Sequence, residues 1–328
     1  DNKVPERFRR LGVRIGTMKD VIIHAVMTRL TDRNGFYTSS ATKRFLKWAD
    51  DYNPDILWLH NIHGYYINIE LLFNWIKSRP DMQVFWTLHD CWTFTGHCTH
   101  FIVAKCDKWK TQCENCPQKN RYPSSLIDNS RKNYDDKKRL FTGVKNMTII
   151  TPSNWLAGLV KQSFLKDYPV EVRHNSIDTG IFRPTPSDFR EKFGLEKKII
   201  VLGVANVWDE RKGLNDFVRL SEMLDPEKFA VVLVGLNPKQ IKSLPKNITA
   251  IQRTQNQKEL AGIYTTSDVF FLSSYEENYP TVSLEAQACG TPVIAYDAGG
   301  SPETLTDPRS KLVQTGDIES VKNILESL

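Results

Sequence analysis

Long apolar stretches and mixed polar stretches follow one another through the second half of the chain. The apolar stretches are continuous, which is typical of strands buried on both faces. They span residues 198–204, 229–235, 248–251, 268–274 and 292–296. Helix-like stretches lie between them, at residues 214–224, 257–265 and 281–289. Strands that alternate with helices predict a parallel sheet covered on both faces.

The first half of the chain repeats this order. Its strand-like stretches span residues 55–60, 84–89, 147–151 and 170–173. Its helix-like stretches span residues 19–30, 38–49, 69–77 and 154–163. Ser153 is placed to cap the last of these helices. The sequence therefore predicts an α/β protein made of two Rossmann-like, doubly wound units.

A polar segment that ends in proline, residues 175–184, marks the predicted domain boundary. We expect an amino-terminal domain over residues 1–182 and a carboxyl-terminal domain over residues 183–328. A cysteine-containing, loop-rich insertion of about residues 91–130 interrupts the first domain. Because doubly wound sheets bind ligands beyond the carboxyl ends of their strands, we expect a site in a central cleft between the domains.

Composition narrows the class of protein. The chain has 328 residues, of which 40% are hydrophobic and 25% charged, as in globular proteins with room for two sizeable cores. Its net charge of +6 favours an anionic partner or an anionic membrane surface, although a well-solvated surface explains it equally well. No apolar run approaches the length of a membrane span, and the first residues lack a signal-peptide core, so a reducing compartment is the default.

Four cysteines lie close together in the insertion. They are Cys98, Cys106, Cys113 and Cys116, and the last two have the C-x2-C spacing of a metal knuckle. Four thiolates suit tetrahedral zinc, which would stabilise a polar, loop-rich segment. Disulfides and free thiols are the alternatives. We predict a structural zinc ion with no catalytic role.

The stretch YEENYPTVSLEA, residues 275–286, combines acidic residues with a helix start. Glu277 lies in the loop, Pro280 near the first helical turn and Glu285 inside the helix. The unpaired amides of residues 278–282 would form an anion site for phosphates. The two carboxylates would then accept hydrogen bonds from hydroxyls. Alternatively, they form a surface acid pair that only favours the helix start.

The two acids and the residues after them form a recognisable signature. The E-x7-E of Glu277 and Glu285, followed by A-x-A-C-G-T-P-V-I over residues 286–294, resembles the carboxyl-terminal signature of the retaining family 4 glycosyltransferases. These enzymes have the GT-B fold. Residues 298–303 fit the same family, and residues 175–178 are similar to its N-G-I-D linker. The resemblance is closest to bacterial enzymes of capsule, exopolysaccharide and lipopolysaccharide assembly.

The resemblance implies roles for these residues. Glu285 would contact the nucleotide ribose and Glu277 the donor sugar. Backbone groups between the two acids would hold the sugar and phosphate. Here these are the residues Asn278, Tyr279, Pro280 and Thr281, of which proline has no N–H to donate. The pair Lys212-Gly213 matches the family's K-G.

The resemblance also implies two cations for the diphosphate. Lys212 supplies one of them. The family's arginine usually stands earlier, where this chain has Ala205-Asn206, so Arg211 is the candidate for the second cation. Cations there would neutralise the charge that grows on the leaving group. The alternative is a solvated cation pair at a helix start.

The other domain offers candidates at the end of a strand. His89 resembles a family histidine that reaches the donor sugar near the reacting centre, and Asp90 would orient it or meet the acceptor. The alternative for His89 is a histidine that is satisfied at a strand end. His60 and His63 are further candidates, either for lining the cleft or for core packing.

The sequence thus predicts a retaining glycosyltransferase of the hexosyltransferase type. It would move a sugar from a UDP- or GDP-linked donor to a hydroxyl of a glycan or lipid-linked acceptor in bacterial surface polysaccharide synthesis. The donor site has no metal-binding D-x-D, so we expect no cofactor for catalysis. We expect no nucleic-acid partner and a cytoplasmic location, with peripheral contact to the inner face of the membrane.

Two alternatives come from other classes of protein. One is a non-catalytic module with the same scaffold that binds sugars or polyanions. The other is a related epimerase or hydrolase of nucleotide sugars. Family members usually open with a strand and a Gly-rich loop and close with a helix that crosses back to the first domain. We expect this chain, which shows neither, to be a truncated or partly ordered form of a longer one. Donor base, sugar, acceptor and oligomeric state stay open.

Overall fold

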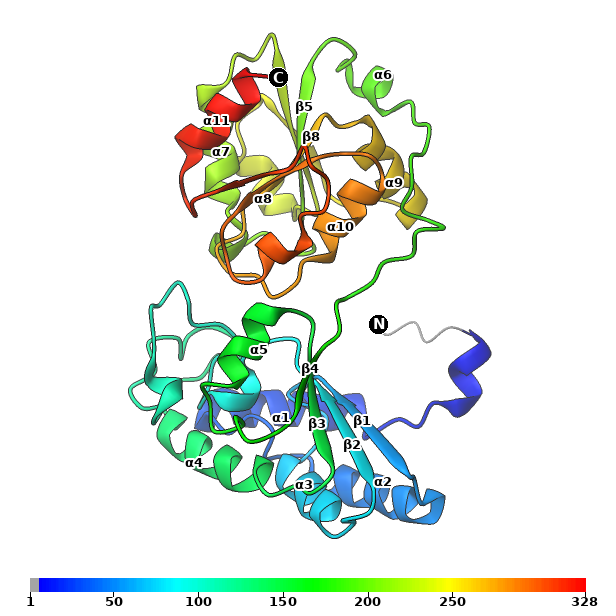
Figure 1. Cartoon of the computed structure of the whole chain (residues 1–328), viewed down its shortest axis with the longest axis vertical. Coiled ribbons are helices and arrows are strands. Elements are labelled where there is room, and N and C mark those ends of the chain that lie inside the picture. Colours follow the sequence, from blue (N-terminus) through cyan, green and yellow to red (C-terminus); the bar gives the residue numbers. More distant parts are fainter. Residues whose placement is uncertain (1–5) are drawn as a thin grey trace. The chain divides into compact units, whose positions relative to one another are not determined.

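The computed structural model describes residues 6–328, which form two compact units (Figure 1). Unit 1 contains the chain up to Thr151 together with Ala157–Val172, and unit 2 contains Pro152–Leu156 and Arg173–Leu328. The chain therefore leaves unit 1 at Val172, ten residues before the boundary predicted at residues 182 and 183. Residues 1–5 of the predicted first domain lie outside the described residues.

Unit 1 is built on a sheet of four parallel strands. In sheet order these are β1 (Ile56–His60), β2 (Gln83–Thr87), β3 (Met147–Thr151) and β4 (Val170–Val172). The register pairs His60 with Thr87, so β1 and β2 end at the same level. The side chains that follow these two strands are therefore delivered to one edge of the sheet.

The helices of unit 1 lie between and beside these strands. The α-helices are α1 (Met18–Thr31), α2 (Ser39–Tyr52), α3 (Ile69–Lys77), α4 (Ser130–Phe141) and α5 (Asn154–Val160). Short 3-10 helices are η1 (Glu6–Leu11), η2 (Trp92–Phe94) and η3 (Lys108–Lys110). The core under α3 and α4 is aromatic. The Phe73 ring lies 5.2 Å from Trp86 and 4.5 Å from Phe141, between ring centroids, in tilted geometries that favour aromatic pairs.

Unit 2 is built on a sheet of six parallel strands. In sheet order these are β10 (Lys311–Val313), β9 (Val293–Tyr296), β8 (Val269–Leu272), β5 (Ile199–Val204), β6 (Phe229–Val234) and β7 (Ile248–Ile251). The chain begins the sheet at β5, builds outward to β7, and then returns to place β8 on the other side of β5. The order therefore reverses between β5 and β8, which is the place where doubly wound sheets bind ligands.

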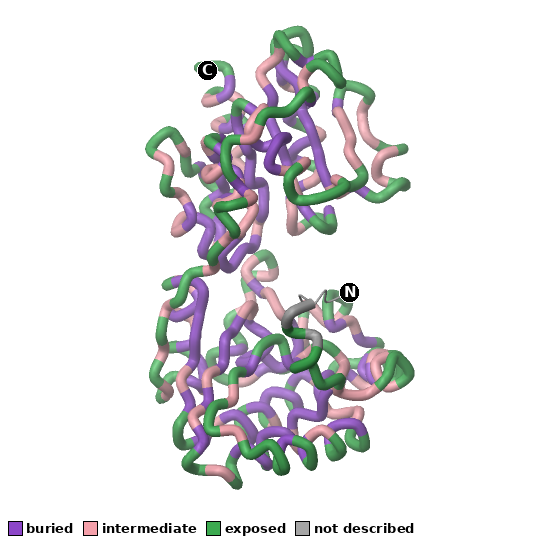
Figure 2. The backbone as a smooth tube through the Cα atoms, turned by 90° about the vertical axis from the view of Figure 1, so that its right-hand side faces the viewer, coloured by how far each residue is buried: buried purple, intermediate pink, exposed green. Residues whose placement is uncertain are grey.

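Helices cover both faces of this sheet (Figure 1). They are α6 (Phe189–Phe193), α7 (Leu214–Met223), α8 (Pro238–Ser243), α9 (Gln257–Thr266), α10 (Thr281–Ala288) and α11 (Ile318–Glu326), with the 3-10 helices η4 (Glu210–Lys212) and η5 (Ser301–Thr304). One buried core contains residues of α7 and α11, and a second contains residues of α9 and α10. Buried residues run through the middle of this unit (Figure 2), and β6, β8 and β9 are buried along their whole length.

Side chains of β5 alternate between the two cores. Val201 belongs to the core under α7 and α11, whereas Ile200 and Leu202 belong to the core under α9 and α10. A strand that is apolar on both faces therefore appears in the sequence as an unbroken apolar run. The predicted parallel α/β architecture is confirmed in both units, and the reversed strand order of a doubly wound sheet is present in unit 2. Within residues 6–328, no helix combines the length and the apolar character that crossing a membrane requires.

Phe217 of α7 tests how strongly unit 2 depends on this packing. Its ring is fully buried against Trp208 and Phe271, with ring centroids 5.4 Å and 5.0 Å away. Phe217→Ala should lower the free energy of unfolding by about 3–5 kcal/mol, because it removes buried apolar area and leaves a cavity. Phe193→Ala, at a ring that is 40% exposed, is the matched control and should change stability by less than about 1 kcal/mol. Urea unfolding of both variants measures the difference.

Candidate functional site

Two loops of unit 2 meet where the strand order reverses. The loop after β5 contains η4, with Arg211 and Lys212. The loop after β8 contains Glu277 and leads into α10. Because β5 and β8 are hydrogen-bonded neighbours with parallel directions, both loops emerge from the same edge of the sheet. Strand pairing therefore brings together two segments that are about 65 residues apart in the sequence.

The loop after β5 is fixed to the end of β8 by backbone contacts. The Tyr275 N–H donates to the carbonyl of Arg211 at 2.8 Å, and the Ser273 hydroxyl donates to the carbonyl of Lys212 at 2.8 Å. Gly213 has a φ of 72°, and a Cβ there would lie 2.3 Å from the carbonyl oxygen of Ser273. The glycine of the K-G pair is thus required by this close approach.

Lys212 and Glu277 form an ion pair between the two loops. The carboxylate side chain of Glu277 is only 11% exposed. Burial alone would raise the pKa of Glu277, but the ammonium of Lys212 and then the guanidinium of Arg211 outweigh it and hold this pKa below its usual value. Arg211 Nη1 also donates to the carbonyl of Glu276 at 3.0 Å. The two predicted cations therefore surround the first acid of the E-x7-E motif.

A third segment closes on the loop after β8. The Gly300 N–H donates to the Glu277 carbonyl at 3.0 Å. A Cβ at Gly299 would lie 1.9 Å from that carbonyl oxygen, and one at Gly300 would lie 1.8 Å from the carbonyl oxygen of Asn278. The pair Gly299-Gly300 thus permits an approach that no side chain would allow. It holds the backbone of the acid loop in place.

Asn278 and Tyr279 are held by residues near the point where the chain enters unit 2. The Ser153 hydroxyl donates to Asn278 Oδ1 at 2.7 Å. Asn175, the first residue of the linker motif, donates from Nδ2 to the Tyr279 carbonyl at 3.1 Å. The His174 ring stacks on Tyr279, with centroids 4.7 Å apart and an interplanar angle of 14°. These contacts orient the backbone between the two acids.

α10 starts at Thr281 with Pro280 as its N-cap, and no side chain caps its first amides. The positive end of the helix dipole therefore faces the loop that contains Glu277. Glu285, in the second turn, accepts a hydrogen bond from the Tyr264 hydroxyl at 3.1 Å. Burial raises the pKa of Glu285, and hydrogen bonds from Tyr264 and Thr281 offset part of the rise.

Unit 1 brings histidines together at the ends of β1 and β2. His60 Nδ1 lies 3.0 Å from His89 Nε2, a hydrogen bond in which one ring donates and the other accepts. Burial lowers the pKa of His60, and burial followed by the charge of His60 lowers the pKa of His89. Both rings are therefore neutral at pH 7. The in-register pairing of His60 with Thr87 explains why these two rings meet.

Asp90 is engaged on both carboxylate oxygens. Oδ2 lies 3.0 Å from His63 Nε2, and Oδ1 accepts from the Trp92 N–H at 2.9 Å. Burial would raise the pKa of Asp90, but His63 outweighs it and keeps the carboxyl ionised. The Tyr122 hydroxyl donates to the His63 carbonyl at 3.1 Å. Asp90 therefore orients His63, which is one of the further candidates predicted from the sequence. Tyr122, which is 59 residues from His63, had no sequence signal.

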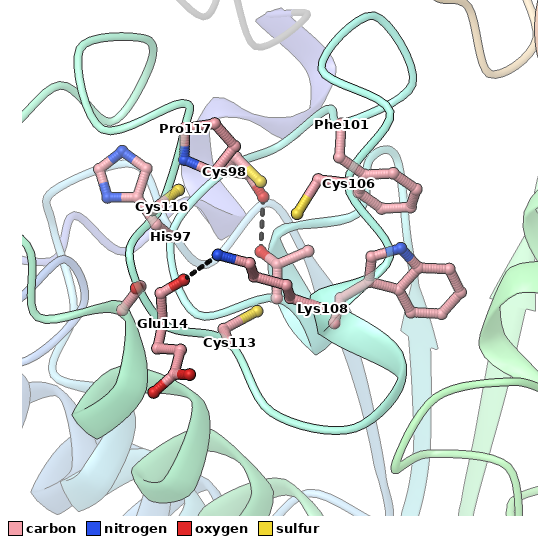
Figure 3. Close-up of a pocket in the computed structure, with 12 residues that line it drawn as sticks. His97, Cys98, Phe101, Cys106, Lys108, Cys113, Glu114, Cys116 and Pro117 are labelled. Atoms are coloured by element: carbon pink, nitrogen blue, oxygen red, sulfur yellow. Dashed lines mark hydrogen bonds between the residues drawn. The ribbon is translucent and has the colours of Figure 1, made fainter.

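The four clustered cysteines of the insertion also come together in unit 1. Cys98, Cys106, Cys113 and Cys116 line one pocket, and all of them are free thiols (Figure 3). The pocket lies in the segment between β2 and α4. The spacing in the sequence thus predicted their proximity.

Comparison with known proteins decides the family. Residues 186–328, which make up most of unit 2, match the family described as glycosyl transferases group 1. The match covers most of unit 2 and less than half of the chain. All the predicted donor-site residues, from Arg211 to Glu285, lie within it.

The relatives of this chain are named for glycosyl transfer. WcaC of Escherichia coli strain K12, named for glycosyl transfer in colanic acid biosynthesis, is 27% identical over 81% of this chain and 65% of its own length. A D-inositol 3-phosphate glycosyltransferase of Mycobacteroides abscessus is 30% identical over 44% of this chain and 35% of its own. The chain thus spans less than two thirds of these relatives.

Solved structures extend the likeness to both units. Sucrose-phosphate synthase of Thermosynechococcus elongatus has a TM-score of 0.65 at 18% identity, over 88% of this chain and 68% of its own. HepE of Anabaena, solved in complex with UDP, has a TM-score of 0.63 at 16% identity, over 88% and 72% of the two chains. The predicted GT-B fold of this chain is confirmed.

The ion pair of the glycosyltransferase domain makes stability depend on pH. Because the folded pKa of Glu277 lies below its ordinary value of 4.5, the pair stabilises the fold fully above pH 4.5 and loses this effect as the pH falls through the lower, folded pKa. Glu277→Gln should lower the free energy of unfolding by about 1.5–3 kcal/mol at pH 7. The deficit should shrink toward pH 3. Denaturant unfolding at several pH values checks this, with Glu222→Gln, at an exposed position, as control. A deficit that is constant with pH would contradict it.

Proposed function

We propose that the chain transfers a sugar from a nucleoside-diphosphate sugar to a hydroxyl of a glycan or lipid-linked acceptor during polysaccharide synthesis. The observation that carries the proposal is the meeting of two cations, a helix start and two carboxylates where the strand order of unit 2 reverses. The family of unit 2 supports it, as does the likeness to WcaC. HepE, which shares the fold, has also been solved with UDP-glucose.

The donor would bind to unit 2. Its diphosphate would contact Arg211, Lys212 and the first amides of α10, which together supply positive charge and N–H donors. An isolated Glu277 carboxylate would repel this diphosphate. Its pairing with Lys212 removes that repulsion, because the ammonium can face the carboxylate and a phosphate oxygen at once. Glu277 is then placed to accept a hydrogen bond from a hydroxyl of the donor sugar.

Glu285 would bind the ribose of the nucleotide. Tyr264 holds one of its carboxylate oxygens, which fixes the orientation of the group. A carboxylate accepts hydrogen bonds from two neighbouring hydroxyls, which is the arrangement that a ribose presents. The ribose would therefore be held beside the second turn of α10, and the diphosphate beside its first turn.

The residues of unit 1 would contact the donor sugar and the acceptor. His89 is held by His60 in a neutral pair, so it can donate or accept a hydrogen bond without adding charge. Asp90 is a positioning residue, because both of its oxygens are already bound by His63 and the Trp92 N–H. It would act through the orientation of His63.

The transfer would proceed with retention of configuration. The acceptor oxygen would attack the anomeric carbon on the face from which the nucleotide leaves. The bond between the anomeric carbon and the phosphate oxygen breaks, the new glycosidic bond forms, and the departing phosphate takes the hydroxyl proton. Arg211 and Lys212 would stabilise the negative charge that grows on the nucleoside diphosphate.

Incubation with radiolabelled UDP- and GDP-sugars and a panel of acceptors tests the function. Label incorporated into a glycan or lipid-linked product supports the proposal. Free labelled sugar without acceptor dependence indicates a hydrolase, and a changed sugar on an intact nucleotide indicates an epimerase. Binding of the nucleotide sugar with no reaction on any acceptor would favour the non-catalytic module. The anomeric configuration of the product, read by NMR, tests retention.

Lys212 has two proposed roles, which are contact with the diphosphate and neutralisation of Glu277, and its substitution tests both. Lys212→Ala should weaken nucleoside-diphosphate binding about 10- to 100-fold, since it removes a charge-assisted contact of about 1.5–3 kcal/mol and exposes the charge of Glu277. In the double variant Lys212→Ala/Glu277→Gln, part of the affinity should return because the repulsion is gone. Isothermal titration calorimetry measures all three proteins, with Lys242→Ala on α8 as control. Unchanged affinity in Lys212→Ala would contradict the donor assignment.

His89 should affect turnover more than donor binding. His89→Asn should lower kcat for transfer about 100-fold, because it displaces a group placed near the reacting atoms, while the Kd for the nucleoside diphosphate stays within about 2-fold. Steady-state kinetics and calorimetry on the same preparation give both quantities. An equal loss in nucleotide affinity would show instead that His89 acts on the fold or on donor binding.

A further inference from the structure

The cysteine-lined pocket of unit 1 is separate from the residues assigned to the donor. Its four thiols belong to the segment between β2 and α4 and are drawn around one pocket in Figure 3. Cys98 and Cys113 are buried, and Cys106 and Cys116 are half-buried. No two of these cysteines are joined by a disulfide. Four thiols from one 19-residue stretch thus face a common space in a segment with little regular structure.

The backbone around the thiols is shaped to approach sulfur closely. The Gly96 N–H donates to Cys113 Sγ at 3.2 Å. A Cβ at Gly96 would lie 2.8 Å from the Cys113 Cβ and 2.1 Å from the carbonyl oxygen of Ser130, so only glycine fits there. Backbone N–H groups directed at sulfur stabilise a thiolate, and metal-bound thiolates commonly receive such bonds.

A buried cation lies beside the pocket. Lys137 of α4 is 1% exposed. Its Nζ donates to the carbonyls of Trp92 and Thr95 at 2.8 and 3.0 Å and lies 3.5 Å from the centroid of the Trp92 ring. The carbonyls and the aromatic face solvate the ammonium, and the carboxylates of Asp32 and Asp90 also favour its charged form.

Deprotonated cysteines would add further negative charge beside Lys137. Thiolates of Cys113 and Cys98 would favour the charged form of its ammonium, as Asp32 and Asp90 do. Thr95 joins the two groups, because its carbonyl binds Lys137 and its hydroxyl donates to the Cys98 carbonyl at 2.6 Å. Zn²⁺ bound by four thiolates has a net charge of −2, which would offset the charge of Lys137.

We propose that Cys98, Cys106, Cys113 and Cys116 bind one structural Zn²⁺ ion, with Lys137 as the charge-balancing residue beside it. Tetrahedral four-sulfur sites select zinc or iron–sulfur clusters among the common metals. Within residues 6–328, no three His, Cys, Asp or Glu side chains are already arranged as a metal site. Binding would therefore require the four cysteine side chains to rotate until their sulfurs surround one point, with release of the thiol protons to solvent.

The metal would also fix a residue near the histidines of unit 1. Cys116 is bound through its N–H to Asp128 at 2.6 Å, and the loop that follows it brings Tyr122 to His63. A zinc ion that holds Cys113 and Cys116 would restrict this loop. The effect on the acceptor depends on the proposed function, whereas the metal site itself does not. Metal content and activity therefore test the two proposals separately.

The zinc content of the full chain, purified under reducing conditions without chelator, tests the site. We expect one zinc per chain, little iron, and four thiols that become reactive toward a thiol reagent only after a chelator is added. Cys113→Ser should lose the zinc. Cys289→Ser, at the buried cysteine of unit 2, is the matched control and should retain it.

A second measurement does not depend on the folding of any variant. Wild-type protein stripped by chelator should bind Co²⁺ at one equivalent and show the absorption bands of a tetrahedral tetrathiolate site, and Zn²⁺ should displace it. Zinc should also raise the thermal stability of the stripped protein. The proposal is overturned by no stoichiometric metal uptake together with clustered thiols whose reactivity does not change when a chelator is added. It is also overturned by bound iron in place of zinc, or by disulfides among the four cysteines in the reduced preparation.

Discussion

The ion pair between Lys212 and Glu277 is the interaction on which the site of unit 2 depends. It joins the loop after β5 to the loop after β8 at the only reversal of strand order in the described six-stranded sheet. The glycine pair Gly299-Gly300 holds the acid loop from a third direction, and Gly213 lets the cation loop reach Ser273. These glycines allow close backbone contacts that hold the two loops in place. The Lys212 ammonium and the Glu277 carboxylate therefore meet with little exposure to solvent. The pairing of β5 with β8 thus places the two opposite charges of the site next to each other.

That pairing explains how acids can stand beside an anion site. The start of α10 offers amides and a positive dipole end to a phosphate, but an unpaired Glu277 would cancel much of this attraction. Lys212 and Arg211 lower the pKa of Glu277 below its ordinary value, so it stays ionised while its charge is balanced. The environment of Glu285 has the opposite effect on its pKa. Burial raises its pKa and Tyr264 orients it, which suits hydroxyl recognition away from the phosphates.

Sequence patterns predicted most of this architecture, although α11 was missed even though Ile318, Val321 and Leu325 repeat at helical spacing. The strands buried on both faces were all found from their apolar runs, and Ser153 does cap α5, since its hydroxyl accepts from the Leu156 N–H at 3.1 Å. The strand β10 is three residues long, with only Val313 buried, so it left no apolar run. The polar helix α4 was missed because its buried face includes Lys137 and Asn133. Pairings such as Lys212 with Glu277 depend on tertiary structure.

The histidines of unit 1 show which part of a site can be inferred from topology. Once β1 and β2 are known to be parallel neighbours, the meeting of His60 and His89 follows from their positions at two adjacent strand ends. The role of Asp90 does not follow, because its partner His63 is fixed by Tyr122 from the cysteine-containing insertion. Three chain segments with separate constraints therefore determine one arrangement of side chains. A loop-rich insertion can keep Tyr122 in place only if it is itself rigid, and its short 3-10 helices supply little of that rigidity. The clustered thiols are the part of the insertion best placed to supply the rest.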